Sequence, residues 1–253
     1  MLRGWLARKA AAGFVVVEPA GMPSALDGAA GVEWRRDASE LPEALAPDAV
    51  VFAVKPQVFD DVVPPYRRFV RPQTVFLSIA AGKTVGGMAR HLGAEAALVR
   101  TMPNTPAAIG RAITVACANS HVTAAQRGLC EALLAAIGES AWVGDEALLD
   151  PVTAVSGSGP AYVFLLIEAL AAAGAKAGLP ADLALRLARE TVAGAGELAR
   201  TSSDGPARLR EAVTSPGGTT RAALDVLMGE NGLASLLERA VSAATARSRE
   251  LAS

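Results

Sequence analysis

Short runs of consecutive apolar residues recur through the first part of the chain, with helical patterns between them. The apolar runs cover residues 14–18, 50–54, 74–79 and 97–100. Runs that are apolar at every position are typical of parallel strands that are buried on both faces. Apolar residues at helical spacing predict helices over 2–8, 41–45, 85–92 and 123–137. Strands and helices that alternate in this way predict a doubly wound α/β domain.

The pattern changes near residue 150, after which it is helical throughout. Segment 159–178 is apolar on nearly every side, which is typical of a helix buried in a bundle or at a subunit interface. Further helices are predicted over 180–200, 207–213 and 232–251. We therefore expect an α/β domain over residues 1–148 and an all-α domain over residues 149–253.

Composition narrows the class of protein. The 253 residues contain 24 Lys and Arg against 25 Asp and Glu, a formal net charge of −1. This balance argues against nucleic acid or an anionic membrane surface as the main partner. Glu168 and Lys176 interrupt the most apolar stretch, 161–178, so we expect no membrane span there. The first residues lack the long apolar region of a secretory signal, which predicts a cytoplasmic protein.

Metal and disulfide chemistry find little support in the sequence. Cys117 and Cys130 stand in apolar surroundings and are predicted to be free thiols in a reduced compartment. His91 and His121 lie far apart, without the spacing of helical ligands. We therefore predict no metal site.

The ends of three predicted strands carry small residues, prolines and a lysine. They read Val54-Lys55-Pro56, Ala80-Ala81-Gly82 and Thr101-Met102-Pro103-Asn104-Thr105-Pro106. Ligands of doubly wound folds bind beyond the carboxyl ends of the strands, so these ends predict a dinucleotide site. Ordinary connections between strand and helix are the alternative, and Lys55 is either a phosphate contact or a solvated charge.

Glu18 ends the first predicted strand. An acidic residue at this place accepts hydrogen bonds from a ribose 2′-hydroxyl and repels a 2′-phosphate. The position therefore predicts a preference for NADH over NADPH, with a solvated carboxylate as the alternative.

The glycine-rich turn of a dinucleotide-binding fold is not found after a predicted strand. The nearest match to G-x-G-x-x-G, at residues 194–199, falls inside a helical pattern. The chain opens instead with the helix that would follow such a turn. We expect a strand and turn of roughly twenty residues upstream of Met1. A start codon assigned too late is favoured over a true truncation. Without this segment the sheet would lack a central strand, and the cofactor pyrophosphate would lack the turn that binds it.

Segment 209–220, LREAVTSPGGTT, carries the most distinctive local pattern. Ser215 is predicted to cap a helix whose first turn holds Pro216. Gly217 and Gly218 would then leave bare amides that suit a carboxylate, with hydroxyls from Ser215 and Thr219. A plain corner between helices is the alternative. A second glycine-rich segment, 156–161, opens the long apolar helix, where close helix packing explains the glycines equally well.

At these residues the sequence resembles the pyrroline-5-carboxylate reductase family. The matching segments are VFAVKPQ from Val51, LSIAAGKT from Leu77, VRTMPNTPA from Val99, AVSGSGPAYVF from Ala154 and LREAVTSPGGTT from Leu209. They follow the family order over essentially the whole chain, and SPGGTT is the most diagnostic.

The resemblance implies an α/β Rossmann-like, dinucleotide-binding domain followed by a helical substrate-binding and dimerisation domain, assembled as a homodimer or higher homo-oligomer. It implies reduction of L-Δ1-pyrroline-5-carboxylate to L-proline by hydride transfer from NADH or NADPH, the last step of proline biosynthesis. The implied substrate contacts are Ser215, Gly217, Gly218 and Thr219, with Thr219 also catalytic through a hydrogen bond to the ring nitrogen. The implied cofactor contacts are Glu18, Val54, Lys55, Pro56, Ala81 and Asn104.

Two other functions stay open from the sequence. One is a related imine or β-hydroxyacid reductase, although such enzymes use a different substrate loop, often with a catalytic lysine. The other is a non-catalytic homodimeric relative that has lost nucleotide binding, which the lack of a glycine-rich turn favours. Ala212 also replaces a polar residue of some family members, so one cofactor contact is expected to be missing.

Overall fold

The computed structural model describes residues 1–26 and 28–252. The chain forms two compact units, one of Met1–Gly157 together with the chain from Ala244 onward, the other of Ser158–Ala243. These units divide after Gly157, while the domain boundary between residues 148 and 149 stays a prediction.

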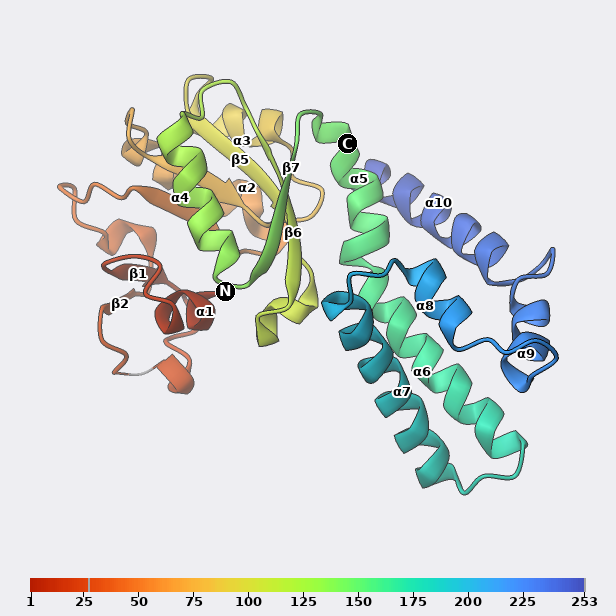
Figure 1. Ribbon diagram of the computed structural model, residues 1–253. Coiled ribbons are helices and arrows are strands. Elements are labelled where there is room, and N and C mark those ends of the chain that lie inside the picture. The colour runs from red at the N-terminus through yellow and green to blue at the C-terminus, as the bar shows by residue number, and fades with distance from the viewer. Residues whose placement is uncertain (27, 253) are drawn as a thin grey trace. The chain divides into compact units, whose positions relative to one another are not determined.

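Two sheets form the framework of the first unit (Figure 1). In the smaller sheet, β1 (Phe14–Val17) pairs in parallel with β2 (Val32–Arg35). The larger sheet has the order β3 (Ala49–Phe52), β4 (Val75–Ser78), β5 (Ala97–Met102), β6 (Ala112–Ala118) and β7 (Gly138–Val143). The four predicted strands are confirmed as β1, β3, β4 and β5, whereas β2, β6 and β7 were not anticipated.

The larger sheet is parallel except at one position. Strand β6 runs antiparallel to β5, because the chain turns back after the short 3-10 helix Thr105–Ile109 at Gly110, which is left-handed with φ of +71°. An antiparallel strand can follow its neighbour through such a short connection, whereas a parallel strand needs a longer crossover.

No ladder joins β1 to β3 among the residues described, so the sheet is divided where we expected a central strand to be lacking. Val17 at the end of β1 nevertheless packs against the core cluster that contains Phe52 of β3. The smaller sheet therefore packs against the core of the larger one.

Helices cover both faces of the larger sheet. Met88 and Leu92 of α3 (Val85–Leu92) pack in the cluster with Phe76 of β4. Cys130 and Leu134 of α4 (Ala124–Ala135) pack on the opposite face. Helix α4 begins at a capping box of Thr123 and Gln126, which satisfies the free amides of its first turn.

Helix α1 (Leu2–Ala7) is attached to α4 by a buried indole. Trp5 Nε1 donates a hydrogen bond to the Leu133 carbonyl oxygen at 2.8 Å, and the Trp5 ring stacks on Phe14 with centroids 5.9 Å apart. The other helices of this unit are short, namely α2 (Phe59–Val62) and α5 (Leu149–Val152). Four predicted helices were placed here, and those over 2–8, 85–92 and 123–137 are confirmed.

The predicted helix over residues 41–45 is wrong. The chain forms a 3-10 helix at Ala38–Glu40 and then a turn in which the Leu45 amide donates to the Pro42 carbonyl oxygen at 3.0 Å. Leu41 is extended, with φ of −72° and ψ of 131°, and Pro47 disfavours helical backbone at Ala46, so too few residues remain between them for a stable α-helix.

The second unit is helical, as expected. It contains α6 (Gly159–Lys176), α7 (Ala181–Thr201), α8 (Pro206–Ala212), α9 (Thr219–Leu227) and the first part of α10 (Leu233–Ala252). Helices α6 and α7 lie side by side (Figure 1) and are joined through Gly178, which has φ of +104°. Helix α9 is the helix expected after Ser215, but it begins later, at Thr219.

Helix α6 leaves its apolar side chains uncovered in the single chain. Phe164 is 59% exposed and Leu165 is 63% exposed. From the sequence we expected this helix to be buried either in a bundle or at a subunit interface. Its exposure excludes burial in a bundle within the single chain. No membrane span was expected here from the sequence. By length and composition alone, however, the helical stretch Glu146–Lys176 could cross a membrane, so these two properties do not exclude one. Interface helices of water-soluble proteins share them.

Both cysteines are buried free thiols. Burial raises the pKa of the Cys117 thiol, and it raises the pKa of Cys130 to about 12. Neither thiol is therefore a reactive nucleophile near neutral pH.

Gly138 provides a test of the packing between β6 and β7. Its φ is +150°, and an added Cβ would lie only 2.7 Å from the Ala112 carbonyl carbon. We expect Gly138→Ala to lower the free energy of unfolding by about 2 kcal/mol or more. Gly128→Ala in α4 is the matched control, since it meets open space and should stabilise the helix by about 0.5–1 kcal/mol. Urea unfolding measures both, and a wild-type midpoint for Gly138→Ala would contradict the argument.

Candidate functional site

Three of the loops that the sequence singled out meet at one edge of the larger sheet. They follow β3, β4 and β5, which are adjacent and parallel. The carboxyl ends of adjacent parallel strands lie at the same edge. The structure therefore brings Val54, Lys55 and Pro56 together with Ala81 and Asn104, at the place where doubly wound folds bind ligands.

The loop after β3 turns directly into a 3-10 helix, Pro56–Val58. Lys55 is extended, with φ of −63° and ψ of 143°, and its carbonyl oxygen accepts the Val58 amide at 3.2 Å. Val54 packs against the core below, while Lys55 is exposed. The backbone is thus fixed by Pro56, and the lysine ammonium extends into solvent at the candidate edge.

The loop after β4 is compact and made of small residues. The Ala80 amide donates to Ser78 Oγ at 3.1 Å, and Gly82 is left-handed with φ of +74°. Thr84 then caps α3 by accepting the Gly87 amide at 2.9 Å. Ala81 is exposed between these fixed points and has no long side chain to obstruct a ligand.

Asp60 connects the loops after β3 and β4. Its Oδ2 accepts a hydrogen bond from Lys83 Nζ at 2.7 Å, and its Oδ1 lies 3.0 Å from His91 Nε2. The hydrogen bonds from Lys83 and then His91 hold the pKa of the Asp60 carboxyl below its usual value, so it is charged at neutral pH. The carboxylate thereby holds α2 close to α3 and limits how far the two loops can separate. The sequence analysis missed this residue.

The Asn104 side chain is committed to partners within the protein. Its Oδ1 accepts the Ile113 amide at 3.2 Å, and its Nδ2 donates to Ser156 Oγ at 3.3 Å. These bonds attach the turn after β5 to β6 and to the π-helical turn Thr153–Gly157. A ligand contact at Asn104 would therefore use its backbone.

Gly157 in the second glycine-rich segment lies close to Met102, the last residue of β5. A Cβ at Gly157 would lie 2.5 Å from Met102 Cε, the flexible end of that side chain. A small shift of the methionine would relieve the contact, so close packing favours a small residue here without requiring glycine.

Glu18 lies at the end of β1 in the smaller sheet. Its Oε1 accepts the Ala20 amide at 3.0 Å, and its backbone carbonyl accepts Trp34 Nε1 at 3.0 Å. A carboxylate can accept about four hydrogen bonds, so these contacts leave Oε2 able to accept a ligand hydroxyl.

The expected helix start at Ser215 is wrong. After α8 the chain first makes a turn in which the Gly218 amide donates to the Ser215 carbonyl oxygen at 3.1 Å. Gly217 is left-handed with φ of +68°, which reverses the chain after Pro216. Helix α9 then begins at Thr219 with Gly218 as its N-cap, so Ser215 is not the N-cap and Pro216 is not in the first turn.

This turn changes which amides are available. The Gly218 amide is used within the turn, and the first hydrogen bond of α9 joins the Ala222 amide to the Gly218 carbonyl oxygen at 3.2 Å. Helical geometry leaves the amides of residues 219–221 without partners inside the helix. A carboxylate binding here would therefore meet the first turn of α9, with the Ser215 and Thr219 side chains exposed beside it.

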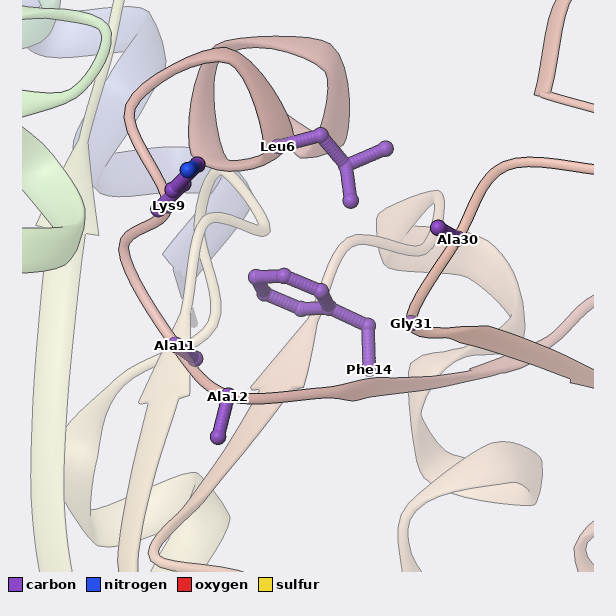
Figure 2. A pocket seen from close by; sticks show the side chains of 7 residues that line it. All are labelled: Leu6, Lys9, Ala11, Ala12, Phe14, Ala30 and Gly31. Atoms are coloured by element: carbon purple, nitrogen blue, oxygen red, sulfur yellow. The ribbon is translucent and has the colours of Figure 1, made fainter.

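Two cavities are also present, one outside the candidate site and one beside the turn before α9. One, of about 390 Å³, is lined by Leu6, Lys9 and Phe14 together with alanines and Gly31 (Figure 2). Phe14 begins β1, so this cavity lies at the opposite end of the strand from Glu18 and outside the candidate site. The other, of about 430 Å³, lies between α8 and α9 and contains the Arg221–Asp225 ion pair at 2.8 Å. No group of three or more metal-ligating side chains occurs within residues 1–26 and 28–252.

Comparison with known proteins places these features in one family. The family model for pyrroline-5-carboxylate reductase dimerisation matches residues 146–251. A pyrroline-5-carboxylate reductase of Pseudomonas aeruginosa is 45% identical over 205 residues, which are 81% of this chain and 75% of that protein. The chain belongs to the pyrroline-5-carboxylate reductase family. A relative from Pisum sativum, also a pyrroline-5-carboxylate reductase, is 44% identical over 81% of the chain and 74% of its own length.

Solved structures of this family share the fold. A pyrroline-5-carboxylate reductase from Coxiella burnetii matches with a TM-score of 0.91 and 34% identity, covering all of this chain and 93% of its own. The enzyme of Plasmodium falciparum, solved with NADP bound, matches with a TM-score of 0.81 and 28% identity at the same coverage. The expected Rossmann-like domain followed by a helical dimerisation region is therefore confirmed.

Membership of the family also confirms the expected activity. The chain is an oxidoreductase of proline biosynthesis that reduces pyrroline-5-carboxylate. Neither a different imine or β-hydroxyacid reductase nor a non-catalytic relative finds support among these matches.

Proposed function

We propose that the carboxyl edge of β3, β4 and β5 holds a nicotinamide dinucleotide and that the turn before α9 holds the substrate. The observation that carries this proposal is the convergence of three short, exposed loops at one edge of a parallel sheet. The proposed cofactor contacts are Val54, Lys55, Pro56, Ala81, the backbone of Asn104, and Glu18. These residues suit a dinucleotide because small side chains and fixed backbone turns allow main-chain amides to approach it closely. When bound, NADH or NADPH supplies the hydride.

The substrate carboxylate binds at the amino end of α9. Amides of the first helical turn and the helix dipole both favour an anion there. Gly217 supplies the left-handed turn, and Gly218 contributes by its size, since a Cβ would lie 3.2 Å from the Ser215 carbonyl oxygen. The Ser215 hydroxyl lies beside the carboxylate. The Thr219 hydroxyl donates to or accepts from the ring nitrogen, which makes Thr219 the catalytic residue.

Catalysis in this arrangement is mainly positioning. The substrate has one strong handle, its carboxylate, and fixing that group together with the ring nitrogen sets the orientation of the imine carbon. Holding two reactants in a near-attack geometry supplies much of the rate without a protein nucleophile. The imine arrives already protonated or takes a proton from solvent.

We propose that Glu18 gives NADH preference over NADPH. Its Oε2 can accept the ribose 2′-hydroxyl while Oε1 stays bonded to the Ala20 amide. A 2′-phosphate would meet the same carboxylate at close range and be repelled.

The protein acts as a homodimer or larger homo-oligomer of the cytoplasm. The exposed apolar side chains of α6 lie inside the region that matches the dimerisation model, and burial between two copies would remove them from water. Two buried, unpaired cysteines agree with a reducing compartment.

Thr219 provides the first test. We expect Thr219→Ala to lower kcat about 100-fold, because the hydroxyl at the reacting nitrogen is lost, while the KM for the cofactor stays unchanged. Thr219→Ser keeps the hydroxyl and is the matched control. The assay follows loss of NADH or NADPH absorbance on adding Δ1-pyrroline-5-carboxylate, and full turnover by Thr219→Ala at saturating substrate would disprove the role.

The same assay on the 253-residue protein tests the proposed function itself. Turnover supports it. Absence of both turnover and NADH binding would contradict it and favour the non-catalytic relative.

Glu18 predicts the cofactor ratio. We expect kcat/KM to be higher with NADH than with NADPH, and we expect Glu18→Gln to reduce that ratio about tenfold by removing the charge that repels a 2′-phosphate. Steady-state kinetics with both cofactors measure the ratio. A wild-type affinity at least about tenfold better for NADPH would contradict the assignment.

Helix α6 predicts the oligomeric state. Leu165→Glu places a charge within an apolar contact, and we expect it to shift the protein towards monomers in analytical ultracentrifugation. Ile109→Glu, at a side chain 77% exposed in the first unit, is the matched control and should leave the assembly intact. Equal assembly of both variants would place the interface on another surface.

A further inference from the structure

The end of α10 is attached to the first unit by one buried hydrogen bond. Ser248 Oγ donates to Asp150 Oδ1 at 2.7 Å, although the two residues are 98 positions apart. Ser248 is 7% exposed and Asp150 is 8% exposed. A hydrogen bond to a carboxylate that is shielded from water is among the stronger kinds in proteins. The bond therefore fixes the last turns of α10 beside α5 (Figure 1).

One turn beyond Ser248, the backbone of α10 lies against the loop after β4. A Cβ at Gly82 would lie 2.8 Å from the Leu251 carbonyl oxygen. Gly82 also has φ of +74°, so glycine is favoured there both by its backbone and by its contact. The end of α10 therefore packs against the Ala80–Ala81–Gly82 loop at Gly82.

The segment that carries Asp150 also holds the far end of this loop. Glu146 Oε1 accepts the Val85 amide at 2.8 Å and Arg100 Nη1 at 2.9 Å. The Arg100 side chain is 6% exposed and the Glu146 side chain 29% exposed, so the pair is partly shielded from water. One short segment, from Glu146 to Asp150, therefore fixes both the start of α3 and the end of α10.

We propose that Ser248 and Asp150 are positioning residues for the nicotinamide cofactor. Their hydrogen bond holds Leu251 against Gly82, and that contact holds the neighbouring Ala81 in its binding conformation. The proposal rests on the proposed cofactor role of Ala81. The last turn of a helix frays readily when nothing fixes it, so loss of the bond would release the loop while leaving the sheet intact.

Helix α10 also connects the two sites along the chain. It follows α9, which begins with Thr219, and it ends under the cofactor loop. The hydrogen bond between Ser248 and Asp150 therefore lies where α10 approaches the proposed cofactor loop at Gly82.

The test compares Ser248→Ala with Ser242→Ala, an exposed serine on the same helix. Two readouts are used on the full chain: the Kd for NADH and for NADPH by calorimetry, and hydrogen exchange of residues 80–84 without cofactor. We expect Ser248→Ala to raise the Kd of the preferred cofactor at least about fivefold and to speed exchange in this loop. The KM for pyrroline-5-carboxylate should stay within about twofold of wild type.

Further variants separate positioning from general stability. Asp150→Asn keeps an oxygen acceptor for Ser248 but removes the charge, which also lies 4.0 Å from Arg249 Nε, so it should weaken cofactor binding less than Ser248→Ala does. Gly82→Ala should weaken binding as much as Ser248→Ala. Gly86→Ala, whose added Cβ would meet only Thr84 Oγ1 at 4.0 Å, is the control for Gly82→Ala.

Three results would overturn the proposal. The first is a wild-type Kd for the cofactor in Ser248→Ala. The second is faster hydrogen exchange throughout Ser248→Ala, with a lower Tm and an unchanged Kd. The third is a Kd raised as much by Ser242→Ala as by Ser248→Ala. A wild-type protein that binds neither cofactor would instead contradict the proposed function, and the exchange measurement would still report whether the tether holds the loop.

Discussion

Burial of β4 on both faces is the constraint on which the first unit depends. Its four residues, Val75 to Ser78, are fully buried. Phe76 faces the cluster with Phe52 and Leu98, while Val75 and Leu77 face the cluster with Cys130 and Leu134. A central strand that is apolar on both sides requires helices on both sides, and helical crossovers keep its neighbours β3 and β5 parallel. The three following loops therefore open at the same edge, and the candidate site is a consequence of how the core is covered.

Long-range polar contacts then give these loops their shape. Asp60 joins the loops after β3 and β4 through Lys83, Asn104 attaches the loop after β5 to Ser156, and Glu146 holds the start of α3. The loops themselves contain small residues and prolines, which leave their backbones open to a ligand. The loops are held rigid by the side chains of Asp60, Asn104 and Glu146, which need not contact the ligand. This division suits a reaction in which the cofactor carries the chemistry and the protein supplies orientation.

Much of the fold could be predicted from the sequence because burial on both faces leaves continuous apolar runs, as in β3, β4 and β5. Strand β2, VEWR, alternates polar residues with apolar ones and gives no such run. The helix expected over residues 41–45 had the right apolar spacing, but the extended backbone at Leu41 and the proline at 47 leave too few residues for a helix. At Ser215 the residue types suggested an N-cap, and the left-handed turn at Gly217 moves the helix start to Thr219.

The candidate loops were found from residue types, but their supports were not. Asn104 was expected at the cofactor, whereas its side chain is bonded to Ile113 and Ser156. The Ser248–Asp150 bond spans 98 positions, and no local pattern in either segment points to the other. Such contacts follow from the three-dimensional path of the chain, which single-residue preferences do not contain.

The sparse core of the helical unit has a consequence for how this protein responds to dilution. Among the residues described between Ser158 and Ala243, the fully buried apolar side chains are those of Ala184 and Ala188, which are both small. Two alanines remove little surface from water, so a second copy that covers the exposed apolar faces, as proposed above, would add most of the favourable burial. By mass action, the folded population of this unit then rises with total protein, and its melting temperature becomes a function of concentration.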